Sequence, residues 1–202
     1  MLLYYITDRT QFPGNEASRR RALLDAIAEA SRSGVDFIQL REKDLSGREL
    51  EALARDAAAM VRENSSRTRL LINSRADVAI ACGVDGVHLR SEDVSPSEVR
   101  AAWRNGKPVI SVACHSPAEV GYAAAERADL AVFAPVFEKQ GSSVAGLSGL
   151  RAACEYPLKV LALGGVTLDN ARACMDAGAA GVAGIRLFQK NEMARLIGAL
   201  RK

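Results

Sequence analysis

The feature that most constrains this chain is a regular alternation of short apolar, strand-like runs with longer stretches of helical periodicity. Strands are predicted over residues 2–6, 36–40, 69–72, 86–89, 109–113, 130–133, 159–163 and 181–184. Helices are predicted over residues 22–30, 50–61, 75–82, 95–103, 117–127, 147–155, 169–177 and 192–200. This succession of strand–helix units predicts an α/β protein that closes into a single (β/α)₈ TIM barrel.

The length of 202 residues lies near the lower end of what such a barrel needs, so few residues remain for loops. The chain contains no linker or low-complexity segment, and we therefore expect one domain over residues 1–202. An open doubly wound sheet is the alternative. It would carry a glycine-rich turn after the first strand, where this chain has Thr7-Asp8-Arg9-Thr10. A barrel places chemistry at the carboxyl ends of its strands.

Composition excludes several classes of protein. The net charge is only +3 and aromatic residues make up 5%, which argues against a nucleic-acid surface built on stacking and basic patches. No apolar run approaches the roughly 18 residues of a membrane span, so we expect a cytoplasmic protein without membrane contact. The cysteines are widely separated and fit neither a zinc site nor a disulfide framework.

Two cations and an amide follow one another at the end of the second predicted strand. Alternation places Gln39, Arg41 and Lys43 on one face, toward the barrel axis. A guanidinium and an ammonium side by side suit a phosphate group. The alternative is a solvated loop in which Arg41 pairs with Glu42.

The third and fourth strands carry three further polar candidates. Asn73 either hydrogen-bonds the edge of a heterocycle or caps the next helix. His88 is flanked by apolar residues, which favours a buried histidine with satisfied hydrogen bonds. Asp93 either caps the following helix or contributes to a Mg²⁺ site together with substrate phosphate.

The fifth and sixth strands are followed by candidates for proton transfer. His115 stands at the end of the fifth strand, and an imidazole titrates near neutral pH. Ser116 before Pro117 is typical of a helix N-cap. The loop after the sixth strand brings the adjacent acid and base Glu138 and Lys139.

Glycines follow the last two strands. Gly164 and Gly165 come after the seventh strand, and Gly184, Ile185 and Arg186 come at the end of the eighth. Glycines at these places let backbone N–H groups approach a phosphate, which barrels commonly hold there. These residues therefore predict a small anionic, phosphorylated substrate.

Together these motifs resemble the superfamily of thiamine-phosphate synthases and TenI-type thiazole tautomerases, over nearly the whole chain. The resemblance rests on Tyr5-Ile-Thr-Asp8, Phe37-Ile-Gln-Leu-Arg-Glu-Lys43, Leu71-Ile-Asn73, Asp77-Val-Ala79, Asp85-Gly-Val-His-Leu89, Glu92-Asp93, His115-Ser116, Pro135-Val-Phe137, Gly164-Gly165 and Asp169-Asn170. It implies a small barrel enzyme of thiamine biosynthesis that binds phosphorylated heterocycles at its mouth.

The resemblance also implies roles for individual residues. Gln39, Arg41 and Lys43 match ligands of the pyrimidine and the pyrophosphate, and Asn73 matches a partner of the pyrimidine. Asp93 matches a Mg²⁺ ligand, and Gly165 with Ile185 matches the pocket for thiazole phosphate. The synthase joins a pyrimidine-methyl pyrophosphate to hydroxyethylthiazole phosphate with Mg²⁺ and releases pyrophosphate.

Departures from the synthase pattern favour the tautomerase-like branch, which transfers a proton and requires no cofactor. Ser74 stands where the synthase has a second metal carboxylate, and Ala113 and Arg186 each replace a serine. In the loop over residues 138–142 the usual threonines and lysine are also replaced. Fewer charges then remain to stabilise a departing pyrophosphate.

The tautomerase pattern itself has a histidine where this chain has Pro135, which leaves His115 or Glu138 as the proton carrier. A Mg²⁺-dependent synthase and a non-catalytic binder of thiamine precursors are the alternatives. The sequence is compatible with a homo-oligomer.

Overall fold

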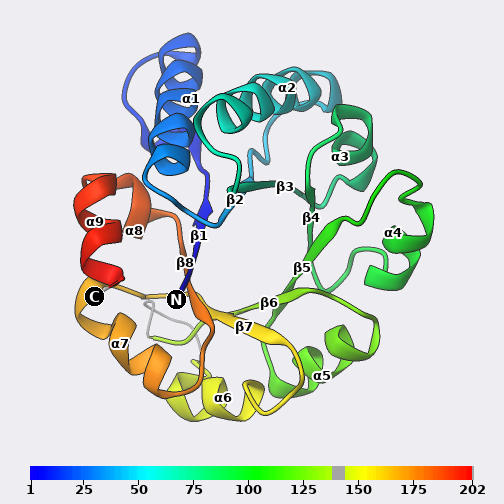
Figure 1. Ribbon diagram of the computed structural model, residues 1–202, viewed down its shortest axis with the longest axis vertical. Coiled ribbons are helices and arrows are strands. Elements are labelled where there is room, and N and C mark those ends of the chain that lie inside the picture. The colour runs from blue at the N-terminus through cyan, green and yellow to red at the C-terminus, as the bar shows by residue number, and fades with distance from the viewer. Residues whose placement is uncertain (138–143, 202) are drawn as a thin grey trace.

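The computed structural model describes residues 1–137 and 144–201, and within them the strands form a closed parallel barrel in chain order (Figure 1). The strands are β1 (Leu2–Ile6), β2 (Phe37–Leu40), β3 (Arg69–Asn73), β4 (Gly86–Leu89), β5 (Val109–Cys114), β6 (Leu130–Phe133), β7 (Lys159–Ala162) and β8 (Gly181–Gly184). Strand β8 pairs with β1 and closes the ring, with Leu2 opposite Gly181 and Tyr4 opposite Ala183. The predicted (β/α)₈ barrel is therefore confirmed.

Helices surround this ring in the order in which they follow the strands (Figure 1). They are η1 (Arg9–Gln11), α1 (Glu16–Arg32), α2 (Gly47–Asn64), α3 (Ala76–Cys82), α4 (Pro96–Ala102), α5 (Pro117–Ala125), α6 (Gly146–Ala153), α7 (Leu168–Asp176), α8 (Arg186–Gln189) and α9 (Met193–Leu200). No helix in the described ranges is long and apolar enough to cross a membrane.

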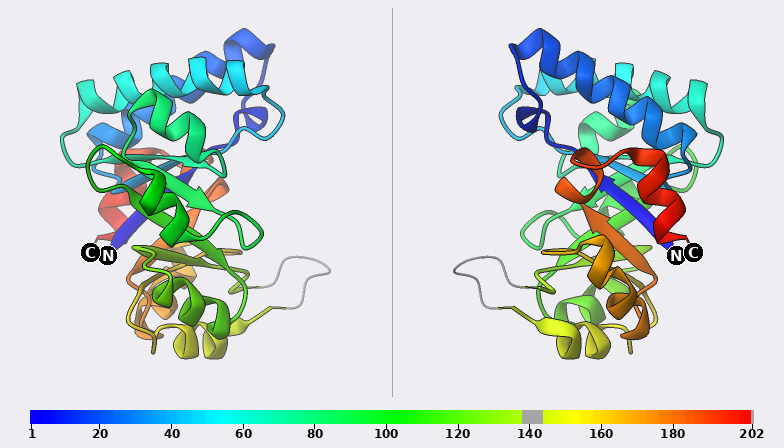
Figure 2. Two further views of the ribbon diagram at one scale, coloured as in Figure 1. Left: turned by 90° about the vertical axis from the view of Figure 1, so that its right-hand side faces the viewer. Right: turned by 90° about the vertical axis from the view of Figure 1, so that its left-hand side faces the viewer.

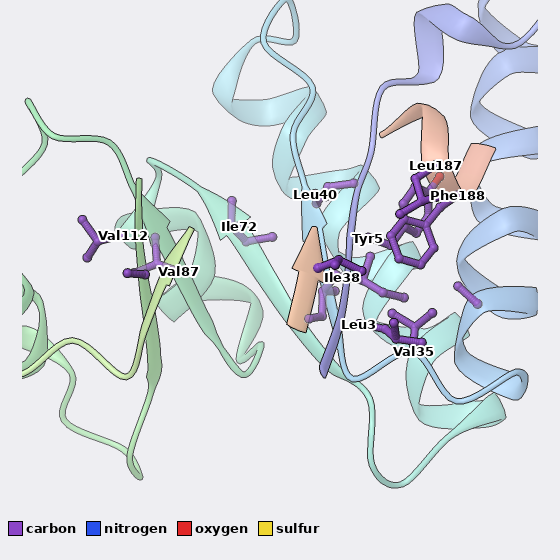
Figure 3. Packing of buried hydrophobic residues seen from close by; sticks show 14 of the residues in the cluster. Leu3, Tyr5, Val35, Ile38, Leu40, Ile72, Val87, Val112, Leu187 and Phe188 are labelled. Atoms are coloured by element: carbon purple, nitrogen blue, oxygen red, sulfur yellow. The ribbon is translucent and has the colours of Figure 1, made fainter. Parts of the chain in front are cut away.

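Two hydrophobic cores follow from the alternation of side chains along each strand. Outward-facing residues such as Ile38, Ile72 and Val87 pack beneath the helices, and Tyr5 meets Phe188 of α8 (Figure 3). A smaller core fills the barrel interior, and it consists of Tyr4, Ile6, Leu71, Leu130, Val132, Leu161 and Ala183. The interior of the barrel is therefore packed with side chains.

Glycine is required at the seam where the barrel closes. A Cβ atom at Gly181 would lie 2.0 Å from the carbonyl oxygen of Leu2, well inside van der Waals contact. The backbones of β8 and β1 can approach this closely only because Gly181 has no side chain.

The loops that follow the strands gather on one face of the barrel, which we call the mouth. In the left view of Figure 2 these loops project to the right, and the blue segment after β1 lies beside the cyan loop after β2. Residues of both loops come into contact there, as Arg9 and Glu42 demonstrate. The mouth is the face on which the sequence predicts the site.

Candidate functional site

A polar cluster interrupts the apolar interior of the barrel below the mouth. His88 Nδ1 lies 3.0 Å from Ser111 Oγ and 3.3 Å from Tyr4 Oη, and all three residues are buried. Burial, together with the positive charge of Arg41, lowers the pKa of His88 to about 4. The expectation of a buried, hydrogen-bonded histidine is confirmed, and His88 is neutral at physiological pH.

Gln39 and Asn73 meet at the ends of β2 and β3. Gln39 Nε2 donates to Asn73 Oδ1 at 2.7 Å, and Asn73 Nδ2 donates to Ser74 Oγ at 3.2 Å. Gln39 is 1% exposed, and its Oε1 has no hydrogen-bond partner within the described residues. The alternative in which Asn73 caps a helix is wrong, because α3 begins at Ala76 without a side-chain cap.

Arg41 and Lys43 follow Gln39 and carry the positive charge of this part of the mouth. Arg41 is half-buried and Lys43 is exposed. Within the described residues neither takes part in an ion pair. The alternative of an Arg41–Glu42 pair is wrong, because the partner of Glu42 is Arg9. Both cations are therefore available to an anionic ligand.

Asp93 lies in the turn between β4 and α4. Its Oδ2 accepts from the backbone N–H of Arg90 at 2.8 Å, and its Oδ1 accepts from Arg90 Nη2 at 3.0 Å. Burial opposes ionisation, but hydrogen bonds from Arg90 and Ser74 outweigh it and hold the pKa of Asp93 below its usual value. The alternative in which Asp93 caps the next helix is wrong, because Ser95 caps α4.

His115 is exposed at the end of β5. Its Nδ1 lies 2.8 Å from the carbonyl oxygen of Ala134, and since a carbonyl only accepts, Nδ1 carries the proton in this contact. Nε2 of the neutral ring is then an acceptor. Ser116 caps α5 by accepting from the backbone of Glu119, as predicted. The geometry leaves His115 able to accept a proton at Nε2.

Gly164 and Gly165 shape the mouth after β7. Both have positive φ, at 93° and 65°, where other residues are strained. A Cβ at Gly165 would lie 2.8 Å from Phe137 Cβ. The glycines therefore let the loop after β6 pack closely against the loop after β7, where the Phe137 N–H donates to the Gly164 carbonyl at 3.0 Å.

The remaining predicted site residues divide into two groups. Ile185 is half-buried and precedes α8, and Arg186 is exposed in its first turn. Glu138 and Lys139 lie outside the described residues. The structure therefore brings Gln39, Asn73 and Ser74 into one hydrogen-bonded group, while His115 and Arg186 belong to other parts of the mouth.

Sequence reasoning missed a buried polar network at the mouth. Thr7 and Arg9 both contact the carboxylate of Glu42, and Arg9 is 3% exposed. Ser111 also escaped notice, although a serine in the inward position of an apolar strand is a detectable signal. The partners of Glu42 carry no local signal, since Thr7 and Arg9 lie more than thirty residues earlier in the chain.

Fold and site together define a small (β/α)₈ barrel whose mouth carries cations beside buried amides. The chain matches the family model described as thiamine monophosphate synthase over residues 3–188. It therefore belongs to the thiamine-phosphate synthase family, enzymes of thiamine biosynthesis.

Individual relatives agree with this assignment. The chain is 36% identical over 190 residues to a putative thiamine-phosphate synthase 2 of Aquifex aeolicus, covering 92% of this chain and 96% of that protein. It is 39% identical over 186 residues to a putative thiamine-phosphate synthase of Geobacter sulfurreducens, covering 90% and 83%. Among solved structures, a thiamine phosphate pyrophosphorylase from Pyrococcus furiosus matches with a TM-score of 0.83 and 29% identity, covering 99% and 93%.

These comparisons confirm the superfamily that the sequence motifs indicate. The relatives named here are synthases, so they support the alternative activity better than the tautomerase-like branch that the departures favoured.

Proposed function

We propose that the protein is a thiamine-phosphate synthase that joins a pyrimidine-methyl pyrophosphate to hydroxyethylthiazole phosphate at the barrel mouth. The observation that carries this proposal is the juxtaposition of the buried Gln39–Asn73 pair with Arg41, a cation that forms no ion pair within the described residues. The amides offer hydrogen bonds to a heterocycle, and the guanidinium offers a fork to its phosphate. The synthase names of relatives at 36% and 39% identity support the same reaction.

The reaction releases pyrophosphate, so the site must stabilise the negative charge of this group as it separates from the pyrimidine. Arg41 and Lys43 follow the end of β2, and they provide charge-assisted hydrogen bonds to such a group. A charge-assisted bond contributes about 1.5–3 kcal/mol, roughly twice a neutral one. Arg41 is therefore the main ligand of the pyrophosphate in this proposal.

Synthases of this family work with Mg²⁺, and the donor set at the mouth fits one such ion in part. Within the described residues one carboxylate, Asp93, lies beside the hydroxyl of Ser74. Proteins commonly hold Mg²⁺ through one or two carboxylates completed by substrate phosphates. Asp93 and Ser74 would hold the ion here, and when bound it supplies positive charge to the leaving pyrophosphate.

The decisive experiment incubates the purified protein with both substrates and measures thiamine phosphate and pyrophosphate with and without Mg²⁺. We expect both products in equal amounts, in a Mg²⁺-dependent manner. Asp93→Asn should lower the rate and raise the Mg²⁺ concentration needed for half-maximal activity. Tight binding of both substrates without any product would exclude the synthase activity and favour a non-catalytic binder.

A tautomerase is the second candidate, and one specific observation favours it. Asp93 is already bound by Arg90 through its backbone and its guanidinium, and Ser74 brings no second carboxylate. A reaction that transfers only a proton does not need that carboxylate, and His115 presents an acceptor nitrogen at the mouth.

This second candidate is tested by adding the thiazole phosphate carboxylate tautomer in the presence of a chelator. A tautomerase accelerates aromatisation without metal, and His115→Gln should slow it. An unchanged rate relative to buffer would eliminate the tautomerase.

A further inference from the structure

The hydrogen-bond ladder between β1 and β2 continues beyond the ends of both strands. The Thr7 N–H donates to the Gln39 carbonyl oxygen at 3.0 Å. In a regular parallel ladder the next bond would run from the Arg41 N–H to the Thr7 carbonyl. Here the Arg41 N–H donates to the side-chain hydroxyl Oγ1 of Thr7 at 2.9 Å. The Thr7 side chain thus replaces a backbone carbonyl as the acceptor of the last hydrogen bond between the two segments, at Arg41.

The Thr7 hydroxyl is itself oriented by Glu42. It donates its only proton to Glu42 Oε1 at 2.6 Å, so its oxygen must act as the acceptor toward Arg41. Thr7 is fully buried and Glu42 is 5% exposed. Solvent therefore competes little for either bond.

The carboxylate of Glu42 is in turn held by Arg9. Its Oε2 accepts from the Arg9 backbone N–H at 3.0 Å and from Arg9 Nη1 at 3.0 Å. Arg9 is also paired with Glu16 and Asp44 at 2.8 Å and 2.7 Å. The far end of the network is thereby tied to α1 and to the loop after β2.

The network lies on the opposite side of the chain from the Arg41 side chain. Tyr4 and Ile6 belong to the inner core and Tyr5 to the outer one, so alternation places Thr7, and with it Glu42, on the outer side of the barrel wall. Arg41 directly precedes Glu42 and continues the ladder, so it lies on the same side as Gln39. Burying the Arg9–Glu42 ion pair costs desolvation energy that its attraction need not recover, so the pair is weak evidence for a stabilising role. We therefore look for a role in positioning.

We propose that Thr7 and Glu42 are positioning residues that orient Arg41 toward the anionic group of the substrate. The inference rests on the proposed function only in taking Arg41 as a ligand of that anion. Neither Thr7 nor Glu42 touches the substrate in this arrangement. Their effect passes through the backbone N–H of Arg41.

The test compares Thr7→Val, which removes the hydroxyl at nearly constant shape, with Thr7→Ser, which keeps it. Binding of inorganic pyrophosphate is measured by calorimetry, and folding is checked by circular dichroism and thermal unfolding. We expect Thr7→Val to weaken binding about tenfold, since misplacement by about an ångström has effects of this order or larger. Thr7→Ser should restore binding to within about twofold. Equal affinities for wild type and a folded Thr7→Val protein would overturn the inference.

A double-mutant cycle separates positioning from general destabilisation. If Thr7 acts through Arg41, then Thr7→Val has no further effect on pyrophosphate binding once Arg41→Ala is present. If the two substitutions reduce pyrophosphate affinity by factors that multiply in the double variant, the inference is overturned.

Glu42→Gln provides a second route in case Thr7→Val does not fold. Removing a negative charge beside Arg41 and Lys43 should by itself tighten the binding of an anion. Positioning predicts the opposite sign, because an amide cannot accept from both Thr7 and Arg9 as the carboxylate does. Tighter binding by Glu42→Gln would therefore contradict the proposal.

The same measurements distinguish failure of this inference from failure of the proposed function. A protein that binds pyrophosphate in a Thr7-dependent way but forms no thiamine phosphate retains the positioning role and loses the synthase activity. A protein that forms thiamine phosphate with the same KM after Thr7→Val retains the activity and loses the positioning role. Wild-type protein that does not bind pyrophosphate at all would overturn the inference.

Discussion

Arg41 and Asn73 differ in the kind of hydrogen bond that each offers a ligand. Arg41 is a half-buried cation, whereas Asn73 is a neutral amide that already accepts from Gln39. We expect Arg41→Ala to weaken binding of the pyrimidine-methyl pyrophosphate by about 1.5–3 kcal/mol and Asn73→Ala by about 0.5–1.5 kcal/mol. Isothermal titration of both variants against the same ligand checks this order, and equal losses would contradict the role of Arg41.

His88 predicts a dependence of stability on pH. Its pKa is lowered to about 4 by burial in the folded protein, while an unfolded histidine titrates near 6.5. The folded state therefore binds fewer protons than the unfolded state in this window. The stabilisation is fully present above about pH 6.5 and is lost as pH falls toward about 4, by a total of about 3 kcal/mol.

His88→Asn is the control, because its amide replaces Nδ1 as a partner for Ser111 and does not titrate. Urea unfolding between about pH 4.5 and 8 should give a steeper loss of stability at low pH for the wild type than for the variant. Parallel curves would show that His88 does not cause the loss.

At the scale of the element, the start of α4 is stabilised by a capping box. Ser95 Oγ accepts from the backbone of Glu98 at 3.3 Å, and the Glu98 carboxylate accepts from the Ser95 N–H at 2.9 Å. We expect Ser95→Ala to lower the free energy of unfolding by about 1 kcal/mol. Denaturant unfolding measures this, and Ser91→Ala, an exposed serine in the preceding loop, is the matched control. A similar loss from both substitutions would rule out the cap as the cause.

The strands and longer helices could be predicted from sequence because their signals are local. The predicted strand over 69–72 is observed as Arg69–Asn73, and Ser95 and Ser116 cap helices as their prolines indicate. Helix α8 was not predicted, because Arg186–Gln189 spans four residues and shows no periodicity. Helices and strands were therefore predictable where their apolar residues recur with a regular period.

The site was predictable only in part, for a different reason. Alternation placed Gln39 on the inner face of the barrel, and its side chain is 1% exposed. The structure was needed to show that Glu42 pairs with Arg9 and not with Arg41. The sequence could not pair Glu42 with Arg9, or Asn73 with Gln39, because each contact depends on which strands become neighbours. Tertiary neighbours of a polar residue leave no periodic signal in the chain.

At the scale of the whole molecule, closure of the barrel depends on the seam between β8 and β1. We expect Gly181→Ala to destabilise the protein by about 3 kcal/mol or more, because its Cβ would collide with the Leu2 carbonyl. Gly198→Ala in α9 is the matched control, since nothing lies within 4 Å of a Cβ there. It should stabilise the protein by about 0.5–1 kcal/mol. Guanidinium unfolding of both variants checks the opposite signs, and a neutral Gly181→Ala would mean that the seam adapts.

A single domain over residues 1–202 and a homo-oligomeric state stay predictions. Truncation from either end and light scattering at several concentrations would test them.

The hydrogen bonds that lead from Gln39 to Asp93 all run in one direction. Gln39 donates to Asn73, Asn73 donates to Ser74, and Ser74 supports the Asp93 carboxylate. The Asp93 carboxylate can only accept, so Ser74 must donate to it and accept from the Asn73 amide nitrogen. The Asn73 oxygen then accepts from Gln39 Nε2, and Gln39 Oε1 is left as an acceptor without a partner within the described residues. This oxygen is buried, and any group that reaches it must be a donor such as an amino group. A carbonyl brought to the same place would meet a like dipole, so the position selects by hydrogen-bond polarity, independently of any phosphate that a ligand carries.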